Sequence, residues 1–196
     1  MKKLKGPFPH LIQVEPDLYI RQLCSADAWP LWLLTDANRV HLARWLPWVE
    51  NIQEPSHSMH FITTSDKLSK LGQECHWGIF SDDLLIGLIW LHQISQENRK
   101  ASIGYWLVES ATGQGFLTKS LKPFISHLFS HMNFHRIEIR AAVSNWPSRH
   151  VPERLGFTSE GTLRESEWLY DHFVDLHVYS MLDSEWTAPA TPEAKQ

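Results

Sequence analysis

The chain contains few cysteines and no excess of positive charge. Cys24 and Cys75 are the two cysteines among 196 residues, and their spacing fits neither a metal site nor a redox motif, so we expect two reduced, packed thiols. The sequence has no long run of Lys or Arg, and its formal net charge is −4. A protein whose main task is to bind nucleic acid needs a basic face that neutralises phosphates, so the composition disfavours that class.

Long hydrophobic runs are also absent from the sequence. The segment from Met1 to Pro9 is too polar for the core of a signal peptide. The apolar stretch from Leu84 to Leu91 is far shorter than the roughly 20 residues of a membrane-spanning helix. We therefore expect a cytoplasmic protein that contacts neither a membrane nor nucleic acid directly.

The length and composition favour one folded domain. With 43% hydrophobic and 20% charged residues, a chain of 196 residues can build a sizeable core without disulfides. We predict a single domain over residues 1–186, in which residues 1–16, rich in proline and glycine, form an irregular arm. Residues 187–196 have almost nothing to bury and are predicted to be a disordered tail.

Hydrophobic periodicity predicts the elements of the N-terminal half. A first strand is expected near residues 18–23, and two short helices are expected within residues 27–45, separated at Thr35 and Asp36. A third helix is predicted over residues 58–71, with Ser58 as its cap and Gly72 as its stop. Segments rich in branched and aromatic residues then predict three antiparallel strands, at residues 76–80, 84–93 and 101–108.

The second half begins with a long apolar stripe at helical spacing. This stripe runs from Leu117 to Met132, and Pro123 inside it is expected to cost a hydrogen bond and to kink the helix. The remaining predicted elements are a strand, a short helix and a last strand, at residues 136–143, 148–155 and 173–182. This order of elements predicts an α/β fold, an α+β sandwich with a mixed sheet.

The most informative segment is the turn between the strand predicted at residues 101–108 and the long helix. Gly113 and Gly115 let backbone N–H groups converge, and the helix start adds its unpaired donors and the positive end of its dipole. Residues 110–137 contain no Asp or Glu but include Lys119, Lys122 and Arg136. The segment is therefore typical of an anion-binding turn.

Three other interpretations of this turn compete with that one. It can be a connector without a ligand. A nucleotide-binding P-loop is a near match, because Gly113 to Ser120 departs from the pattern only at Thr118, but the strand ending at Val143 lacks the aspartate that would help to hold magnesium. A dinucleotide fingerprint fails for the same missing glycine at position 118.

The motifs around the turn resemble those of a known family. About thirty residues after Gly-Gln-Gly stand Asn145-Trp-Pro-Ser148-Arg149 and then Pro152-Glu-Arg-Leu-Gly-Phe157, a combination that strongly resembles the GNAT N-acetyltransferases. Residues 38–48, 160–164 and 168–172 resemble the RimJ/RimL-like branch, which includes ribosomal-protein N-terminal acetyltransferases. The resemblance implies a mixed, mostly antiparallel sheet with a splayed parallel strand pair and helices on both faces.

The resemblance also implies acetyl-CoA as cofactor and assigns residues to it. The pantetheine arm would pair with the main chain of Trp106, Leu107 and Val108, and Asn145 would hydrogen-bond to it. As an alternative, Asn145 caps the following helix. The pyrophosphate would rest on the turn, whose assigned residues are Gly113, Gln114, Gly115, Phe116, Leu117 and Thr118.

The chemistry that the family implies is direct attack of an amine on the thioester. Ser148 would protonate the departing thiolate, and Glu167 would act as general base. Competing carboxylates are Glu165, Glu160 and Glu50. Trp45 and Trp48 are candidates to line a groove for the acceptor substrate. His127, His131 and His135 recur every four residues, but without a His-Glu-x-x-His pattern we expect no metal site.

These assignments predict an acetyl-CoA-dependent N-acetyltransferase that acts on a protein or peptide N-terminus, with a ribosomal protein as the leading acceptor. The protein would be a monomer or a homodimer. Rival functions are acetylation of a small-molecule amine, a non-catalytic acyl-CoA-binding module and the near-match P-loop NTPase.

Overall fold

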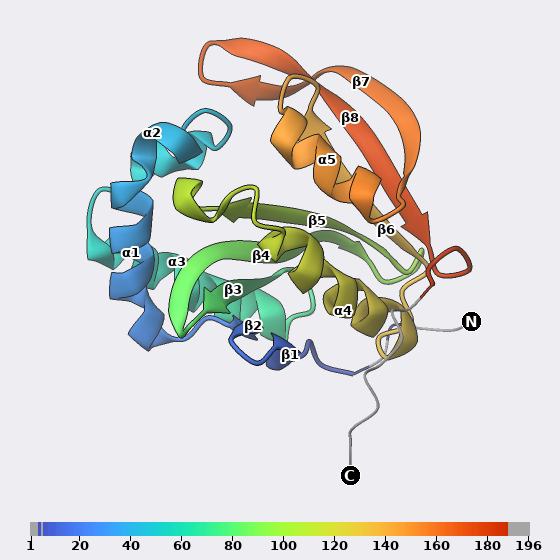
Figure 1. Ribbon diagram of the computed structural model, residues 1–196, viewed down its shortest axis with the longest axis horizontal. Helices are drawn as coiled ribbons and strands as arrows, with labels where there is room; N and C mark the ends of the chain where they lie inside the picture. Colours follow the sequence, from blue (N-terminus) through green and yellow to red (C-terminus); the bar gives the residue numbers. More distant parts are fainter. Residues whose placement is uncertain (1–3, 5, 188–196) are drawn as a thin grey trace.

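The computed structural model of the protein describes residue 4 and residues 6–187. Its centre is one sheet of eight strands in the order β1-β2-β3-β4-β5-β6-β8-β7, antiparallel throughout except for the parallel pair β5 and β6 (Figure 1). The strands are β1 (Leu11–Glu15), β2 (Leu18–Gln22), β3 (Cys75–Ser81), β4 (Leu84–Ser95), β5 (Lys100–Leu107), β6 (Arg136–Ala142), β7 (Thr158–Leu169) and β8 (His172–Leu182). The predicted mixed, mostly antiparallel sheet is confirmed.

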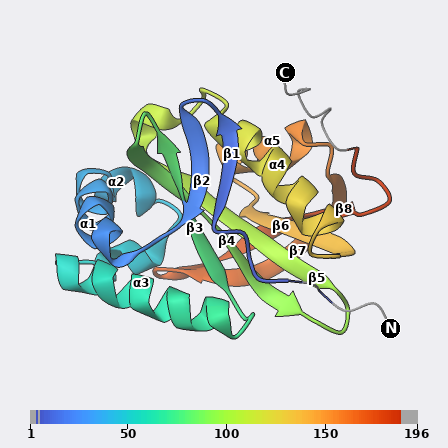
Figure 2. The same cartoon turned by 90° about the horizontal axis from the view of Figure 1, so that it is seen from below.

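Helices cover both faces of the sheet, as Figures 1 and 2 show. On one face lie α1 (Ala28–Ala37), α2 (Arg39–Leu42) and α3 (Pro55–Lys70), and on the other lie α4 (Phe116–Ser130) and α5 (Trp146–Arg154). Short 3-10 turns complete the connections, at Ser25–Asp27, Pro47–Asn51 and Glu109–Ala111. Among the described residues, no helix has the length and hydropathy needed to cross a bilayer.

The expected irregular arm over residues 1–16 is wrong in its second half. Leu11–Glu15 is strand β1, paired antiparallel with β2. Pro16 lies in the turn of that hairpin and Pro9 lies before the strand, so neither proline removes a donor from the ladder. The predicted disordered tail, residues 187–196, lies outside the described residues except for Thr187.

Two helix boundaries differ from the prediction for local reasons. The break between α1 and α2 falls at Asn38, because Thr35 stays inside α1, where its hydroxyl donates to the carbonyl of Leu31 at 2.9 Å. Helix α3 begins at Pro55 and not at Ser58, since proline fits the first helical position, where no backbone donor is needed. Gly72 follows the end of α3 with a φ of +68°, as expected for a helix stop.

The stripe on α4 supplies the centre of the core. Leu121, Phe124, Ile125 and Leu128 are completely buried, and the ring of Phe124 meets Trp77 of β3 edge-on at a centroid distance of 4.8 Å. Helix α4 continues through Pro123 to Ser130, so Met132, the last residue of the predicted stripe, lies beyond it and is buried from the following loop. This packing fixes the start of α4 relative to the sheet.

We expect Phe124→Ala to destabilise the fold by about 3–5 kcal/mol, because it removes a fully buried ring and leaves a cavity against Trp77. Urea unfolding would show a lower midpoint with an unchanged slope. Phe173→Ala is the matched control, since Phe173 is 56% exposed and should cost less than about 1 kcal/mol. Equal losses for the two variants would contradict this view of the core.

Candidate active site

The parallel strands β5 and β6 separate before they end. They pair from Lys100 and Arg136 as far as Ile103 and Ile139, but β5 continues to Leu107 and β6 continues to Ala142 without further pairing between them. The gap is part of a cleft of about 540 Å³ that is lined from both faces of the sheet, by α2 and the segment after it on one side and by α5 and the glycine turn on the other. The predicted wedge beside Leu107 is present.

Alternation along β5 decides which main-chain groups face this wedge. The amide of Val108 donates to Ile86 at 2.9 Å, and its carbonyl accepts from Ala111 at 3.1 Å, so both groups are used within the protein. Trp106, two residues earlier and opposite Leu88, directs its main chain toward β4 in the same way. Leu107 and Tyr105 therefore present their N–H and C=O groups to the gap. The pantetheine contacts expected of Val108 and Trp106 do not fit this geometry.

The glycine turn has free donors. Gly113 and Gly115 adopt φ values of +75° and +82°, and a Cβ added at either position would meet nothing. Within the described part of the chain, no protein acceptor binds the amides of residues 113–118, and the helical ladder starts with the amide of Lys119 on the carbonyl of Gly115 at 2.9 Å. Free amides, open space and a helix N-terminus fit a diphosphate, as acetyl-CoA requires.

Most of the assigned turn residues border the cleft. Gly113, Gly115, Phe116, Leu117 and Thr118 line it. Gln114 does not line it, and its side-chain amide donates back to the carbonyl of Ser110 at 2.7 Å.

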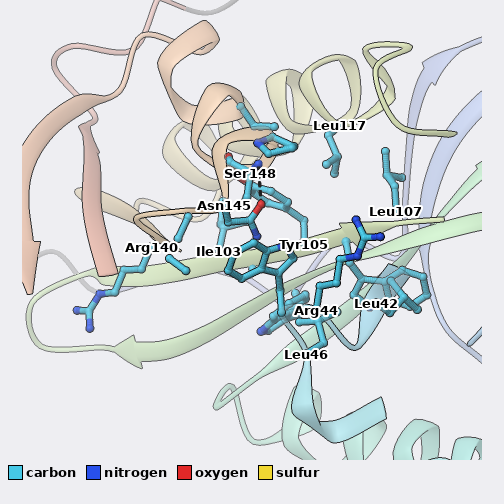
Figure 3. Close-up of a pocket in the computed structure, with 18 of the residues that line it drawn as sticks. Leu42, Arg44, Leu46, Ile103, Tyr105, Leu107, Leu117, Arg140, Asn145 and Ser148 are labelled. Carbon is cyan, nitrogen blue, oxygen red and sulfur yellow. Dashed lines mark hydrogen bonds between the residues drawn. The ribbon is translucent and has the colours of Figure 1, made fainter. Parts of the chain in front are cut away.

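The first turn of α5 brings Asn145 and Ser148 to the cleft, as Figure 3 shows. The Oδ1 atom of Asn145 accepts the amide of Ser148 at 3.3 Å, so Asn145 is the helix cap and α5 begins at Trp146, two residues before the predicted start. The Nδ2 atom of Asn145 and the hydroxyl of Ser148 have no protein partner among the described residues. Both groups stay available to a ligand.

Tyr105 is a site residue that sequence reasoning missed. Its hydroxyl donates to the carbonyl of Ser148 at 2.8 Å and thereby joins β5 to the first turn of α5. Burial raises the pKa of Tyr105 far above its usual value, so the hydroxyl stays protonated. The tyrosine stands in the strand motif Tyr105-Trp-Leu, whose alternation places its side chain on the face opposite that of Trp106.

Glu167 is the carboxylate of the cleft. It lies on β7 opposite Val174, lines the cleft, and has no ion-pair partner among the described residues. Desolvation raises its pKa above the ordinary value of 4.5. By contrast, hydrogen bonds from Arg136 lower the pKa of Glu160 to about 2, and Glu165 and Glu50 do not border the cleft.

The two tryptophans assigned to the acceptor groove separate in the structure. Trp45 lines the cleft, whereas Trp48 does not and packs against Trp106 at a centroid distance of 6.2 Å. Sequence reasoning also missed Trp90, His92 and Arg140, which line the cleft from β4 and β6. Burial lowers the pKa of His92, so its ring is neutral at pH 7.

The three spaced histidines lie away from this cleft. The ring of His127 on α4 stacks at 4.6 Å on that of His131, which caps the end of this helix, and His135, further along the chain, pairs with Asp183 at 2.9 Å. In the part of the chain that the structure describes, no three His, Cys, Asp or Glu side chains form a group that could hold a metal ion.

Comparisons with known proteins agree with this geometry. The family described as "Acetyltransferase (GNAT) domain" matches residues 17–158. YdaF of Bacillus subtilis, named provisionally as a ribosomal N-acetyltransferase, is 35% identical over 89% of this chain and 96% of its own. The ribosomal-protein-serine acetyltransferase of Escherichia coli is 31% identical over 89% of this chain and 98% of its own. The structure of RimL, an acetyltransferase of ribosomal L7/L12 solved with coenzyme A, superposes with a TM-score of 0.85 at 27% identity, covering 88% of this chain and 97% of RimL.

Proposed function

The chain belongs to the GNAT acetyltransferase family and uses acetyl-CoA, and from this premise we propose that it acetylates the N-terminal α-amine of a protein, with a ribosomal protein as the leading acceptor. One observation carries the proposal. A single cleft joins the free amides of residues 113–118 to the unpaired carboxylate of Glu167 through the gap between β5 and β6. The relatives of similar length named for ribosomal proteins support the choice of acceptor.

The proposal assigns a role to each part of the cleft. When bound, acetyl-CoA supplies an acetyl group activated as a thioester. The amides of residues 113–118 would hold its diphosphate, and the main chain of Leu107 and Tyr105 would pair with its arm, assisted by the Nδ2 atom of Asn145. Ser148 would donate a proton to the sulfur of the departing thiolate, and Tyr105 positions the turn that carries Ser148.

Glu167 takes the proton from the attacking nitrogen. An amine attacks only when it is neutral, and an α-amine is roughly 10 to 20% neutral at pH 7, against about 0.04% for a Lys side chain. A single carboxylate whose pKa is raised by desolvation therefore suffices for an N-terminus, whereas a lysine acceptor would need stronger help. This comparison favours an α-amine as the acceptor.

A mass-spectrometric screen tests the proposed acceptor. Purified protein, isotopically labelled acetyl-CoA and a library of N-terminal peptides from ribosomal proteins would yield peptides labelled on the α-amine. The same library with its α-amines blocked but its lysines free is the control, and it should remain unlabelled. Label on lysine, or turnover with small amines such as polyamines but not with peptides, would overturn the assignment.

A further inference from the structure

We infer that Arg44 selects acceptors that carry a carboxylate side chain at the second or third residue, close behind the reacting α-amine. This inference rests on the proposed function and adds a sequence preference to it. Arg44 lines the cleft from the segment that follows α2, and Figure 3 shows its side chain rising from that segment toward Leu107.

The segment that carries Arg44 is fastened to the hairpin that carries Glu167. The hydroxyl of Tyr170, in the turn between β7 and β8, donates to the carbonyl of Ala43 at 2.6 Å. Tyr170 adopts a φ of +59°, which is uncommon for a residue with a large side chain. Arg44, next to the anchored carbonyl, and Glu167, three residues before Tyr170, therefore lie on two segments that are joined across the cleft.

Two arginines that line the cleft, Arg44 and Arg154, have no protein partner in the described part of the chain, and of the two only Arg44 lies on the α2 side, since Arg154 ends α5. Arg39, five residues before Arg44, binds Asp36 at 2.8 Å and the carbonyl of Val49 at 2.9 Å, so its guanidinium is occupied by groups of the protein itself. Arg140 also lines the cleft, but it binds Glu138 at 2.8 Å, and Figure 3 shows it directed away from Arg44. Within the described residues the protein therefore makes no use of the charge of Arg44, whose exposed side chain is open to an anion that enters the cleft.

The position of Arg44 favours the acceptor over the coenzyme as the source of that anion. The free amides of the glycine turn lie beside α4, whereas Arg44 enters the cleft from the opposite face of the sheet, beside α2. The bond from Tyr170 to Ala43 joins the segment of Arg44 to the hairpin of Glu167, so these joined segments offer the cleft one carboxylate and one guanidinium without a partner among the described residues. These two groups match an amine followed closely by an acid.

Matched peptides test the inference. Wild-type protein and Arg44→Gln would be assayed with two peptides that differ only by Asp or Asn at the second residue, and with a second pair that differs at the third. We expect the wild type to favour the Asp peptide of at least one pair by about 10-fold in kcat/KM, as for a charge-assisted hydrogen bond, and Arg44→Gln to reduce the ratio to about 2 or less. Arg164→Gln, which removes an exposed arginine outside the cleft, should keep the wild-type ratio.

Each contrary result has a separate meaning. Equal kcat/KM values for Asp and Asn peptides in the wild type would overturn the role of Arg44 while leaving peptide acetylation standing. A rise in the KM for acetyl-CoA in Arg44→Gln, with an unchanged Asp to Asn ratio, would assign the guanidinium to the coenzyme's phosphates and would also overturn the inference. No acetylation of any peptide by the wild type would overturn the proposed function itself, and the inference with it.

Discussion

Glu167→Gln is expected to lower kcat/KM for a peptide acceptor by about 100-fold at pH 7, the lower range for loss of a general base. Gln keeps the shape of Glu167 but cannot accept a proton from the attacking amine. The deficit should shrink to about 10-fold or less at pH 9, because an α-amine with a pKa near 8 then loses its proton without help. The measurement is steady-state kinetics from pH 6 to 9 at saturating acetyl-CoA.

Although Glu167→Gln should lower the activity, it should not lower the stability of the fold. Folding raises the pKa of Glu167 by desolvation, so this carboxyl stabilises the fold when protonated, and that contribution is lost as the pH rises through the folded-state pKa. At pH 7 the ionised group bears a desolvation cost that Gln does not, so the variant should unfold at the same temperature as the parent or slightly higher. A combined loss of activity and stability would indicate a structural role for Glu167.

Glu165→Gln is the matched control for this experiment. Glu165 is an exposed carboxylate two residues away that does not border the cleft, and its amide, not its side chain, binds Asp175 at 2.8 Å. Its substitution should leave kcat/KM within about twofold of the parent, as is usual for surface changes. If Glu167→Gln behaved in the same way at pH 7, Glu167 would not be the base.

The elements that the sequence predicted well are those whose signal is local. The stripe on α4 repeats apolar residues at helical spacing, and the strands from residues 75 to 107 are rich in branched and aromatic residues. Gly113 and Gly115 adopt the positive φ values that other residues disfavour. Strand β7 gave no such signal. Nearly all of its residues are exposed, and it exists because β8 pairs with it.

The site residues also divide into those with a local sequence signal and those without one. The free main-chain donors of the turn are predicted by its two glycines and by the start of a helix, so they can be inferred without knowing the fold. The direction of the Val108 and Trp106 main chain depends on which residues of β4 they face, and the partners of Tyr105 and Tyr170 lie 43 and 127 residues away along the chain. Such long-range contacts leave no trace in a local pattern, which is why Tyr105 and Arg44 emerged only from the structure.

Substitutions in the glycine turn are expected to have a large effect on acetyl-CoA binding. Gly115→Asp is expected to weaken acetyl-CoA binding by about 100-fold, because its carboxylate would occupy the open space where the free amides converge and would repel a diphosphate. Gly115→Asn has nearly the same shape without the charge and should weaken binding by about 10-fold. Calorimetric titration with acetyl-CoA at pH 7.5 or so would measure both dissociation constants.

The pair of variants separates binding from folding. Asn and Asp are the residues besides glycine that best tolerate a φ near the +82° of Gly115, and both are favourable next to a helix N-terminus. The protein without coenzyme should therefore keep its unfolding temperature within about 3 °C in both variants, whereas the stabilisation that acetyl-CoA gives the parent should be largely lost in Gly115→Asp. Equal affinities for the Asp and Asn variants would mean that no phosphate approaches residue 115. In that case the amides of residues 113–118 would not be the anchor of the coenzyme, and the positions of Ser148 and Glu167 relative to the thioester would have to be assigned anew.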